Sequence, residues 1–367
     1  MYYRKSSPDV VLFFVVMVLL ALGIVMVYSS SEVTSYFKTG DSFYYLKKQL
    51  LWAIIGLGVM GLMINFDYWK LRGLVLPVLL ASFALLVLVL IPGVGKEVNG
   101  AQRWINLGFT TFQPSEIIKL ALVLFTAYGL SLQGDKVRFF VKGVLPYLLI
   151  LALACGLILA QPDLGTAAAA AGTIYVMLFA AGVRGKHLSY LGLAGVGAIG
   201  VAIAMAPYRM ERFLAFLDPF ADPQGSGFHI IQSLYALGSG GFFGVGLGES
   251  KQKFFYLPEQ HTDFIYAIIG EELGFIGAAL VILLFILYVW RGFKIAIASP
   301  DPFASLLAVG LTSMIGLQAI VNIGVVTGSM PVKGMPLPFI SFGGTSLVFT
   351  LAGVGILLNI SRYTSDK

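Results

Sequence analysis

Three side chains that can move protons, Glu259, His261 and Asp263, lie within five residues of one another, where a polar stretch gives way to an apolar one. A carboxylate beside an imidazole is typical of general acid–base catalysis. The alternative is an ordinary helix start, with Thr262 as N-cap and Asp263 in or beside the first turn, where backbone N–H groups stabilise an anion. Taken alone, these residues favour neither interpretation, because capping carboxylates are common.

A second candidate is the pair Glu116 and Lys119, just inside a stretch that is otherwise apolar. A spacing of three residues places both charges on one face of a helix, where they can pair. Charges at membrane depth are costly and usually mark a site or a cavity. The alternative is a helix-end pair whose charged groups reach the membrane surface.

Three further carboxylates occur in apolar surroundings. Asp163, in a tight turn between two apolar stretches, either caps the following helix or adds a carboxylate to the surface that carries Asp263. Glu271 and Glu272 follow Asp263 by about two helical turns and cannot both face lipid. At least one should face the interior, where it could pair with a buried Lys or Arg.

A proline-rich segment and then a glycine pair precede the last apolar stretch, between Met330 and Ser346. Lys333 and Ser341 lie in this segment, which has the features of a re-entrant loop that leads into a free helix N-terminus. Such a terminus together with Lys333 could hold a phosphate or a pyrophosphate. An ordinary proline-rich turn is the alternative.

No pattern indicates a metal or nucleotide site. His187, His229 and His261 lack the spacing of metal ligands. A divalent cation such as Mg²⁺ or Mn²⁺, held by acidic residues such as Asp263, stays an open alternative, and no other cofactor is expected. The glycine-rich run from residue 238 to 248 is not followed by the Gly-Lys-Ser/Thr of a phosphate loop, so we expect flexible backbone there.

The composition determines which elements must position these residues. Of 367 residues, 58% are hydrophobic and 11% are charged, and the mean hydropathy is +0.89. Soluble domains carry charge on about a quarter of their residues. Apolar runs of about 20 residues recur along the chain, which predicts an all-α polytopic membrane protein. Cys155 is the single cysteine and cannot form an internal disulfide.

We expect about ten transmembrane helices in one integral-membrane domain, with a large extracytoplasmic loop of residues 207–262 between the seventh and eighth. Shorter outer loops cover residues 29–49, 92–116 and 327–340, and Gly192, Gly195, Gly197 and Gly200 predict close helix packing. The expected spans are Val10–Tyr28, Leu50–Ile64, Leu71–Ile91, Ile117–Leu132, Val144–Ala160, Leu164–Val183, Leu188–Ala206, Phe264–Arg291, Phe303–Val326 and Ser341–Ile360.

The distribution of basic residues predicts the orientation. An even number of spans places both termini on one face, which also holds the short loops near Lys70, Lys136, Arg184 and Lys294. That face carries 13 Lys/Arg and 5 Asp/Glu. Lys and Arg are enriched in short cytoplasmic loops, so both termini should be cytoplasmic and the long loops should lie outside.

Several motifs follow one another along the chain: Gln102-Arg103-Trp104, Gln113 to Glu116 with Lys119, Gln161 to Thr166, Ala206 to Arg209, Gly225 to Phe228 with Gln232-Ser233, Leu257 to Gly274, and Pro336 to Ser346. In this order they resemble the SEDS family (shape, elongation, division and sporulation) of bacterial peptidoglycan polymerases. The resemblance covers essentially the whole chain and is greatest to the FtsW and SpoVE branch.

The resemblance implies a glycosyltransferase that polymerises lipid II into glycan strands at the outer face of the bacterial cytoplasmic membrane, for cell division, elongation or spore cortex synthesis. The family's proposed catalytic carboxylate corresponds to Asp263, the general base for the acceptor hydroxyl. Cations must offset the pyrophosphate that leaves. The residues expected to bind substrate are Arg103, Glu116, Lys119, Asp163, Arg209, Arg212, His261, Lys333 and Ser341.

The resemblance also implies partners: lipid II, membrane lipid and a single-span class B penicillin-binding protein with transpeptidase activity, but no nucleic acid. Two other functions remain open, a flippase for the same lipid precursor and a scaffold that recruits the transpeptidase. One difficulty concerns Asp263. A helix N-terminus lowers the pKa of a carboxyl group and weakens it as a base, so burial or a neighbouring carboxylate must raise the pKa again.

Overall fold

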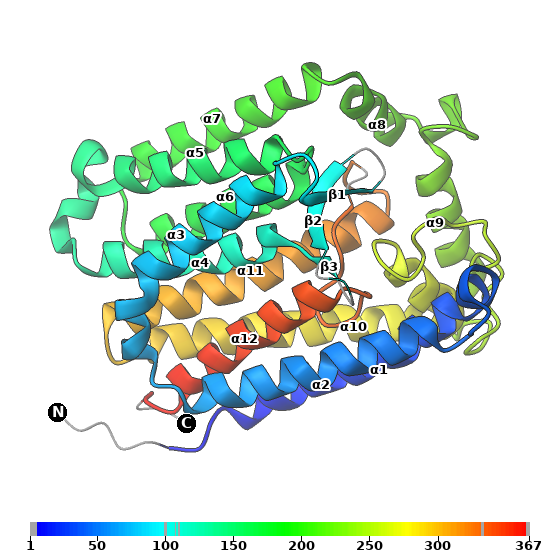
Figure 1. Ribbon diagram of the computed structural model, residues 1–367, viewed down its shortest axis with the longest axis horizontal. Helices are drawn as coiled ribbons and strands as arrows, with labels where there is room; N and C mark the ends of the chain where they lie inside the picture. The colour runs from blue at the N-terminus through cyan, green and yellow to red at the C-terminus, as the bar shows by residue number, and fades with distance from the viewer. Residues whose placement is uncertain (1–5, 99–100, 107, 109–110, 332–333, 365–367) are drawn as a thin grey trace.

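The computed structural model describes residues 6–98, 101–106, 108, 111–331 and 334–364. Ten long helices run roughly along the long axis of the molecule, and both termini lie at one end of the bundle (Figure 1). They are α1 (Val10–Thr39), α2 (Tyr44–Asn65), α3 (Leu71–Val89), α4 (Pro114–Ser131), α5 (Leu145–Leu159), α6 (Leu164–Ala180), α7 (Gly185–Ala204), α10 (Ile265–Ile297), α11 (Pro302–Val326) and α12 (Gly344–Ser361).

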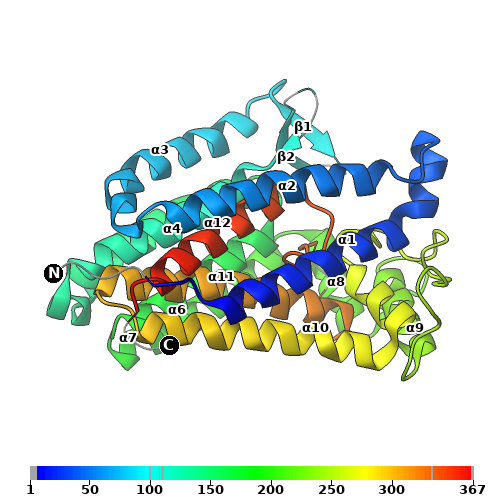
Figure 2. The ribbon, with the colours of Figure 1, turned by 90° about the horizontal axis from the view of Figure 1, so that it is seen from below.

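The helices confirm a polytopic membrane protein. Within the described ranges, nine helices are long and apolar enough to cross a membrane, and α6, with 17 residues, is the shorter tenth. Each of the ten coincides with an expected span. The helices α11 and α12 lie at the centre of the bundle and are mostly buried, whereas α2 and α3 present much apolar surface to the outside (Figure 2).

Short elements gather at the end of the bundle opposite the termini (Figure 1). The expected loop of residues 207–262 contains two helices, α8 (Pro207–Leu217) and α9 (Phe228–Gly240). The segment before α4, expected to be an outer loop, forms a small antiparallel sheet in the order β1-β2-β3, which the sequence did not predict. Its strands are β1 (Gly95–Val98), β2 (Ala101–Asn106) and β3 (Thr111–Phe112). Short helical turns also occur between α2 and α3 (Tyr68–Lys70), between α4 and α5 (Gly134–Arg138 and Phe140–Val144) and between α8 and α9 (Pro219–Ala221).

The prediction that residues 29–49 form a loop is wrong, because most of them are helical. The helix α1 continues to Thr39, where Gly40 ends it with a φ of 73°, and α2 begins at Tyr44. Polar residues in this part of α1 face protein instead of water. Ser29 donates to Glu272, 243 residues away, and the Gln260 side chain donates to Thr34 at 2.7 Å. Partners distant in the sequence therefore allow a polar segment to remain helical and buried.

Of the four α7 glycines expected to pack closely, only Gly192 does so, where a Cβ would lie 3.5 Å from the hydroxyl of Tyr175. A Cβ placed on Gly195, Gly197 or Gly200 would meet nothing within 4 Å. The helix α7 lies at the edge of the bundle and contacts mainly α6 and α8 (Figure 1). Its apolar side chains are exposed, including Leu193 at 72%. This helix therefore presents an apolar surface of the kind that lipid covers.

The helix α10 is broken at Gly274, where φ is 66° and ψ is −167°. The backbone N–H groups of Val245 and Gly246 donate to the carbonyl groups of Glu271 and Glu272, at 3.0 and 3.1 Å. A Cβ on Gly274 would lie 2.3 Å from the backbone nitrogen of Gly244. The break therefore requires glycine, and it lets the loop before α10 bond directly to the helix backbone.

Candidate functional site

A cavity of about 860 Å³ opens between the sheet, α8 and the segments that precede α10 and α12. Seven of the residues expected at the site line it: Arg103, Glu116, Lys119, Asp163, Arg209, Arg212 and Asp263. Two cations that the sequence reasoning missed, Lys48 of α2 and Lys96 of β1, also line it, together with the carboxyl group of Glu259. No spacing in the sequence connects Lys48 or Lys96 with the other residues. Lys333 lies outside the described residues.

Asp263 lies just before α10 instead of inside its first turn. The helix begins at Ile265 with Phe264 as N-cap, so Thr262 does not cap it. The side-chain amide of Asn322 in α11 donates to the backbone carbonyl groups of Asp263, at 2.8 Å, and Met335, at 2.6 Å. This residue holds the segments before α10 and α12 together, and so fixes the backbone that carries the carboxylate.

The surroundings raise the pKa of Asp263 to about 7. Burial is the largest cause, followed by the negative charges of Glu259 and Asp163, while Arg103 and Arg212 oppose the rise. Burial and two neighbouring carboxylates therefore raise the pKa, as a general base at this position requires. A carboxyl group that titrates near neutral pH can accept a proton from a hydroxyl more effectively than an ordinary aspartate.

Ser341 lies behind the wall of the cavity and does not line it. It is buried, its hydroxyl donates to the carbonyl of Thr262 at 2.6 Å, and it accepts from the N–H of Leu337 at 2.7 Å. The N–H of Phe342 donates to the carbonyl of His261 at 2.9 Å. These bonds join the segment before α12 to the segment that carries Asp263. Because its hydrogen bonds are internal, Ser341 positions the site and does not line it.

His261 also lies behind the cavity wall. Its ring is buried, 4.5 Å from the ring of Tyr45 and 5.9 Å from that of Phe342. Burial lowers the pKa of His261 to about 4, so the imidazole is neutral at neutral pH. It therefore supplies no positive charge for a phosphate in this arrangement.

Arg103 and Asp163 meet at the turn before α6. The guanidinium of Arg103 donates to the carbonyl groups of Gln161, at 2.9 Å, and Pro162, at 2.5 Å. The Asp163 carboxylate accepts from the N–H of Thr166 at 3.0 Å and from its hydroxyl at 2.8 Å. Both interpretations of Asp163 therefore hold, because it caps α6 and also lines the cavity.

Glu116 and Lys119 form the ion pair that their spacing predicts, at 3.0 Å. Their side chains are only 6% and 5% exposed, so they face the cavity from within the bundle and not the membrane surface. Lys119 also donates to Gln318 at 3.1 Å, and the Gln318 amide donates to the carbonyl of Pro336 at 2.9 Å. The pair thus supports the segment before α12.

The helices α8 and α2 also contribute cations to the lining of the cavity. Arg209 donates to the hydroxyl of Tyr208 at 2.8 Å and to the carbonyl of Ala202 at 2.9 Å, which links α8 to the end of α7. Lys48 donates to the hydroxyl of Tyr44 at 2.6 Å. With Lys96, Arg103, Lys119 and Arg212, six cations face four carboxylates around one cavity. A site with this surplus suits an anionic ligand.

Glu271 and Glu272 are both buried but do not line the cavity. Glu271 accepts from the hydroxyl of Ser250 at 2.5 Å and from the N–H of Lys251 at 2.9 Å. Glu272 pairs with the buried Lys253 at 3.6 Å, which confirms the predicted cationic partner. These contacts fix the loop that leads to Glu259 and Asp263.

The donor groups do not by themselves fit a divalent cation. Among the described residues, no three His, Cys, Asp or Glu side chains come close enough together to hold a metal ion. A divalent cation such as Mg²⁺ or Mn²⁺, held by Asp263, Glu259 or Asp163, therefore stays an open alternative.

Gly334 leaves room for the Asp263 carboxylate because it has no side chain. A Cβ on Gly334 would lie 2.7 Å from Oδ2 of Asp263, so Gly334→Ala should displace the carboxylate. Displacement by about 1 Å can lower a rate by roughly 100-fold, and we expect a 10- to 100-fold loss of turnover with an unchanged melting temperature. Gly195→Ala in α7, where a Cβ meets nothing, is the matched control. Full activity in Gly334→Ala would contradict close positioning at this point.

Comparisons with known proteins identify the family of this chain. Residues 9–366 match the FtsW/RodA/SpoVE model, described as a cell cycle protein. The chain is 50% identical over 361 residues to stage V sporulation protein E of Bacillus subtilis (strain 168), covering 98% of this chain and 99% of the relative. It is 46% identical over 358 residues to the probable peptidoglycan glycosyltransferase FtsW of Geobacter sp. (strain M18), with 98% of both chains covered.

Two solved structures are similar in fold. One comes from work on structural coordination of polymerization and crosslinking by a peptidoglycan synthase complex, with a TM-score of 0.79, 33% identity, and 98% of this chain and 99% of that chain covered. The other is rod shape determining protein RodA of Thermus thermophilus, with a TM-score of 0.74, 31% identity and 98% of each chain covered. This chain therefore belongs to the FtsW/RodA/SpoVE family of cell cycle proteins.

Proposed function

We propose that this protein is a peptidoglycan glycosyltransferase that polymerises lipid II into glycan strands, with Asp263 as the general base. The observation that carries the proposal is a carboxyl group with a pKa of about 7 in a cavity lined by six cations. The cavity lies at the end of a membrane bundle, where a lipid-linked sugar can enter. Relatives that are probable peptidoglycan glycosyltransferases support the same activity.

In the proposed reaction, Asp263 takes a proton from the hydroxyl of the acceptor sugar. The hydroxyl oxygen attacks the anomeric carbon of the donor chain, the bond from that carbon to the pyrophosphate breaks, and polyprenyl pyrophosphate leaves. Negative charge grows on the leaving group, and Arg103, Lys119, Arg209 and Arg212 are the described cations that would offset it. Glu116 holds Lys119 in place through their ion pair.

The orientation follows from charge and topology. Both termini lie at the end of the bundle opposite the cavity (Figure 1). The basic short loops favour a cytoplasmic location for the termini, which places the cavity at the outer face. A peptidoglycan synthase complex among the similar structures supports a partner that crosslinks the strands, and a class B penicillin-binding protein is the partner that we propose.

Activity should depend on pH through Asp263. Only the ionised carboxylate accepts a proton, so kcat/KM should rise about tenfold between pH 6 and pH 8, with a midpoint near 7. Glu259→Gln removes the larger of the two carboxylate effects on the pKa of Asp263, so the midpoint should move to lower pH. Asp163→Asn should move it in the same direction by less and keeps a side chain that can cap α6. A midpoint unchanged in Glu259→Gln would exclude this carboxyl group as the titrating base.

The direct test is incubation of the purified protein with labelled lipid II, alone and with a class B penicillin-binding protein, followed by a gel that resolves glycan strands. If the pair makes polymer and the Asp263→Asn variant does not, the result supports the glycosyltransferase activity.

A flippase would move labelled lipid II across vesicle membranes without making polymer, and it would need charges along both halves of the bundle. The cavity charges instead gather at one end, around Asp263. A scaffold would not depend on this carboxylate, so the Asp263→Asn variant would still give polymer.

A further inference from the structure

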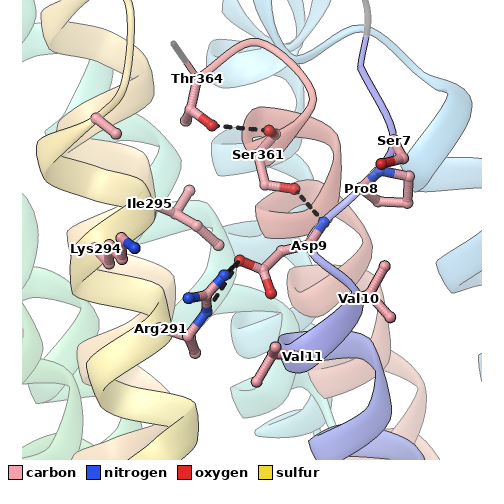
Figure 3. Close-up of a pocket in the computed structure, with 11 residues that line it drawn as sticks. Ser7, Pro8, Asp9, Val10, Val11, Arg291, Lys294, Ile295, Ser361 and Thr364 are labelled. Carbon is pink, nitrogen blue, oxygen red and sulfur yellow. Dashed lines mark hydrogen bonds and ion pairs between the residues drawn. The ribbon is translucent and has the colours of Figure 1, made fainter. Parts of the chain in front are cut away.

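A second cavity lies at the other end of the bundle, between the start of α1 and the ends of α10 and α12 (Figure 3). Its volume is about 220 Å³. Ligand pockets for drug-sized molecules begin at about 300 Å³, so this one suits a smaller polar group. About 30 residues of α10 separate it from Asp263, which corresponds to roughly 45 Å along a helix. The proposed glycosyltransferase reaction therefore makes no use of it.

The walls of this cavity carry two cations and one carboxylate. The guanidinium of Arg291 donates to Oδ2 of Asp9, and Oδ1 of Asp9 accepts from the N–H of Leu12 at 2.8 Å (Figure 3). Both carboxylate oxygens of Asp9 are thus occupied. Lys294 lies one helical turn beyond Arg291 on the same wall, and it forms no ion pair with any residue that the structure describes. The cavity therefore keeps a surplus positive charge.

The remaining lining supplies hydroxyl groups and apolar surface. Ser361 accepts from the N–H of Asp9 at 2.9 Å, and Thr364 donates to the carbonyl of Ser361 at 2.9 Å (Figure 3). Beside these polar groups, Val10 is 68% exposed and Val11 is 42% exposed, and both line the cavity at the start of α1, a helix long enough to cross the membrane. A polar, basic pocket that continues into exposed apolar surface matches a molecule with a charged head and a hydrocarbon tail.

We propose that this cavity binds the headgroup of an anionic phospholipid from the leaflet at the end of the bundle that holds the termini. Lys294 and the free edge of Arg291 contact the phosphate, the hydroxyl groups face the polyol, and an acyl chain lies along Val10 and Val11. Basic pockets between transmembrane helices bind anionic headgroups in this way. The site ties together α1, α10 and α12, so occupancy stabilises the bundle by mass action.

The test uses the purified full-length protein in a detergent with a neutral headgroup. Phosphatidylglycerol, phosphatidylcholine with the same acyl chains, and water-soluble glycerol 3-phosphate are added separately. Bound lipid is counted by native mass spectrometry, and the melting temperature is measured. Phosphatidylglycerol should be retained and should raise the melting temperature, whereas the other two should do neither.

Two variants locate the effect. Lys294→Gln should weaken phosphatidylglycerol binding about fivefold, and Ala298→Met, which fills the cavity without changing charge, should also weaken it. Lys186→Gln, in the first turn of α7 away from the cavity, is the control of equal charge change and should leave binding unaltered. Equal retention of phosphatidylcholine, equal protection by glycerol 3-phosphate, or an equal loss in Lys186→Gln would each overturn the proposal.

Discussion

Asp263→Asn is expected to lower glycan strand synthesis by about 100- to 10,000-fold, the usual contribution of a general base. Asparagine keeps the size of the side chain and the backbone carbonyl that accepts from Asn322, but it cannot accept the proton of the acceptor hydroxyl. The measurement is polymer formed from labelled lipid II by the purified variant together with its transpeptidase partner. Glu249→Gln, an exposed carboxylate outside the cavity, is the matched control and should keep full activity.

The melting temperature of Asp263→Asn at different pH values shows whether the variant has lost only its activity or also its fold. Burial raises the pKa of Asp263 from 3.8 to about 7, so the native state holds this proton more tightly than the unfolded state. Ionisation therefore destabilises the protein progressively as the pH rises from about 4 to above 7. Asp263→Asn removes this cost, so its melting temperature should exceed that of the wild type at pH 8 and match it at pH 4. A lower melting temperature at pH 8 would show that the variant is misfolded.

Lys253→Met is expected to destabilise the protein by about 3 kcal/mol, because it leaves the carboxylate of Glu272 buried without its cation. Lys253 is 2% exposed, and its ammonium also donates to the carbonyl of Gly248 at 2.6 Å. The Gln260 side chain donates to the Lys253 carbonyl at 3.4 Å, so the change should also disturb the approach to Asp263. Unfolding in mixed micelles measures the stability, and the lipid II assay measures the activity.

Two further variants test whether the ion pair itself is responsible. Lys251→Met removes a neighbouring but exposed lysine and should change stability by less than about 0.5 kcal/mol. The double variant Lys253→Met with Glu272→Met replaces both charges with apolar groups and should recover most of the loss, since a buried pair gains little over apolar packing. A double variant as unstable as Lys253→Met would assign the loss to packing around Lys253 and not to the unpaired carboxylate.

The buried polar contacts explain how the loop before Asp263 can hold the geometry of the candidate site. The loop before Asp263 is tied to α10 through Glu271 and Glu272, to α1 through Gln260 and to the segment before α12 through Ser341. Hydrogen bonds at this depth are costly to break, because no water replaces the lost partner. The cavity wall is therefore held by polar residues that never face the substrate.

Local features were predictable from the sequence. Hydropathy depends on consecutive residues, so all ten spans were found, and the spacing of three between Glu116 and Lys119 predicted their ion pair. The capping role of Asp163 and the burial of at least one of Glu271 and Glu272 also followed from neighbouring residues, and the structure buries both glutamates. Each of these properties is decided within one or two helical turns.

The environment of a side chain is decided by residues far away in the chain, and only the tertiary structure shows it. The pKa of Asp263 depends on burial and on Glu259, Asp163 and two arginines brought together at one cavity, so the helix N-terminus alone did not decide it. His261 and Ser341 carry the right chemistry for a site, yet packing places them behind its wall. Hydrophobicity selects which segments enter the membrane, but the folded contacts between segments decide which charges share a cavity.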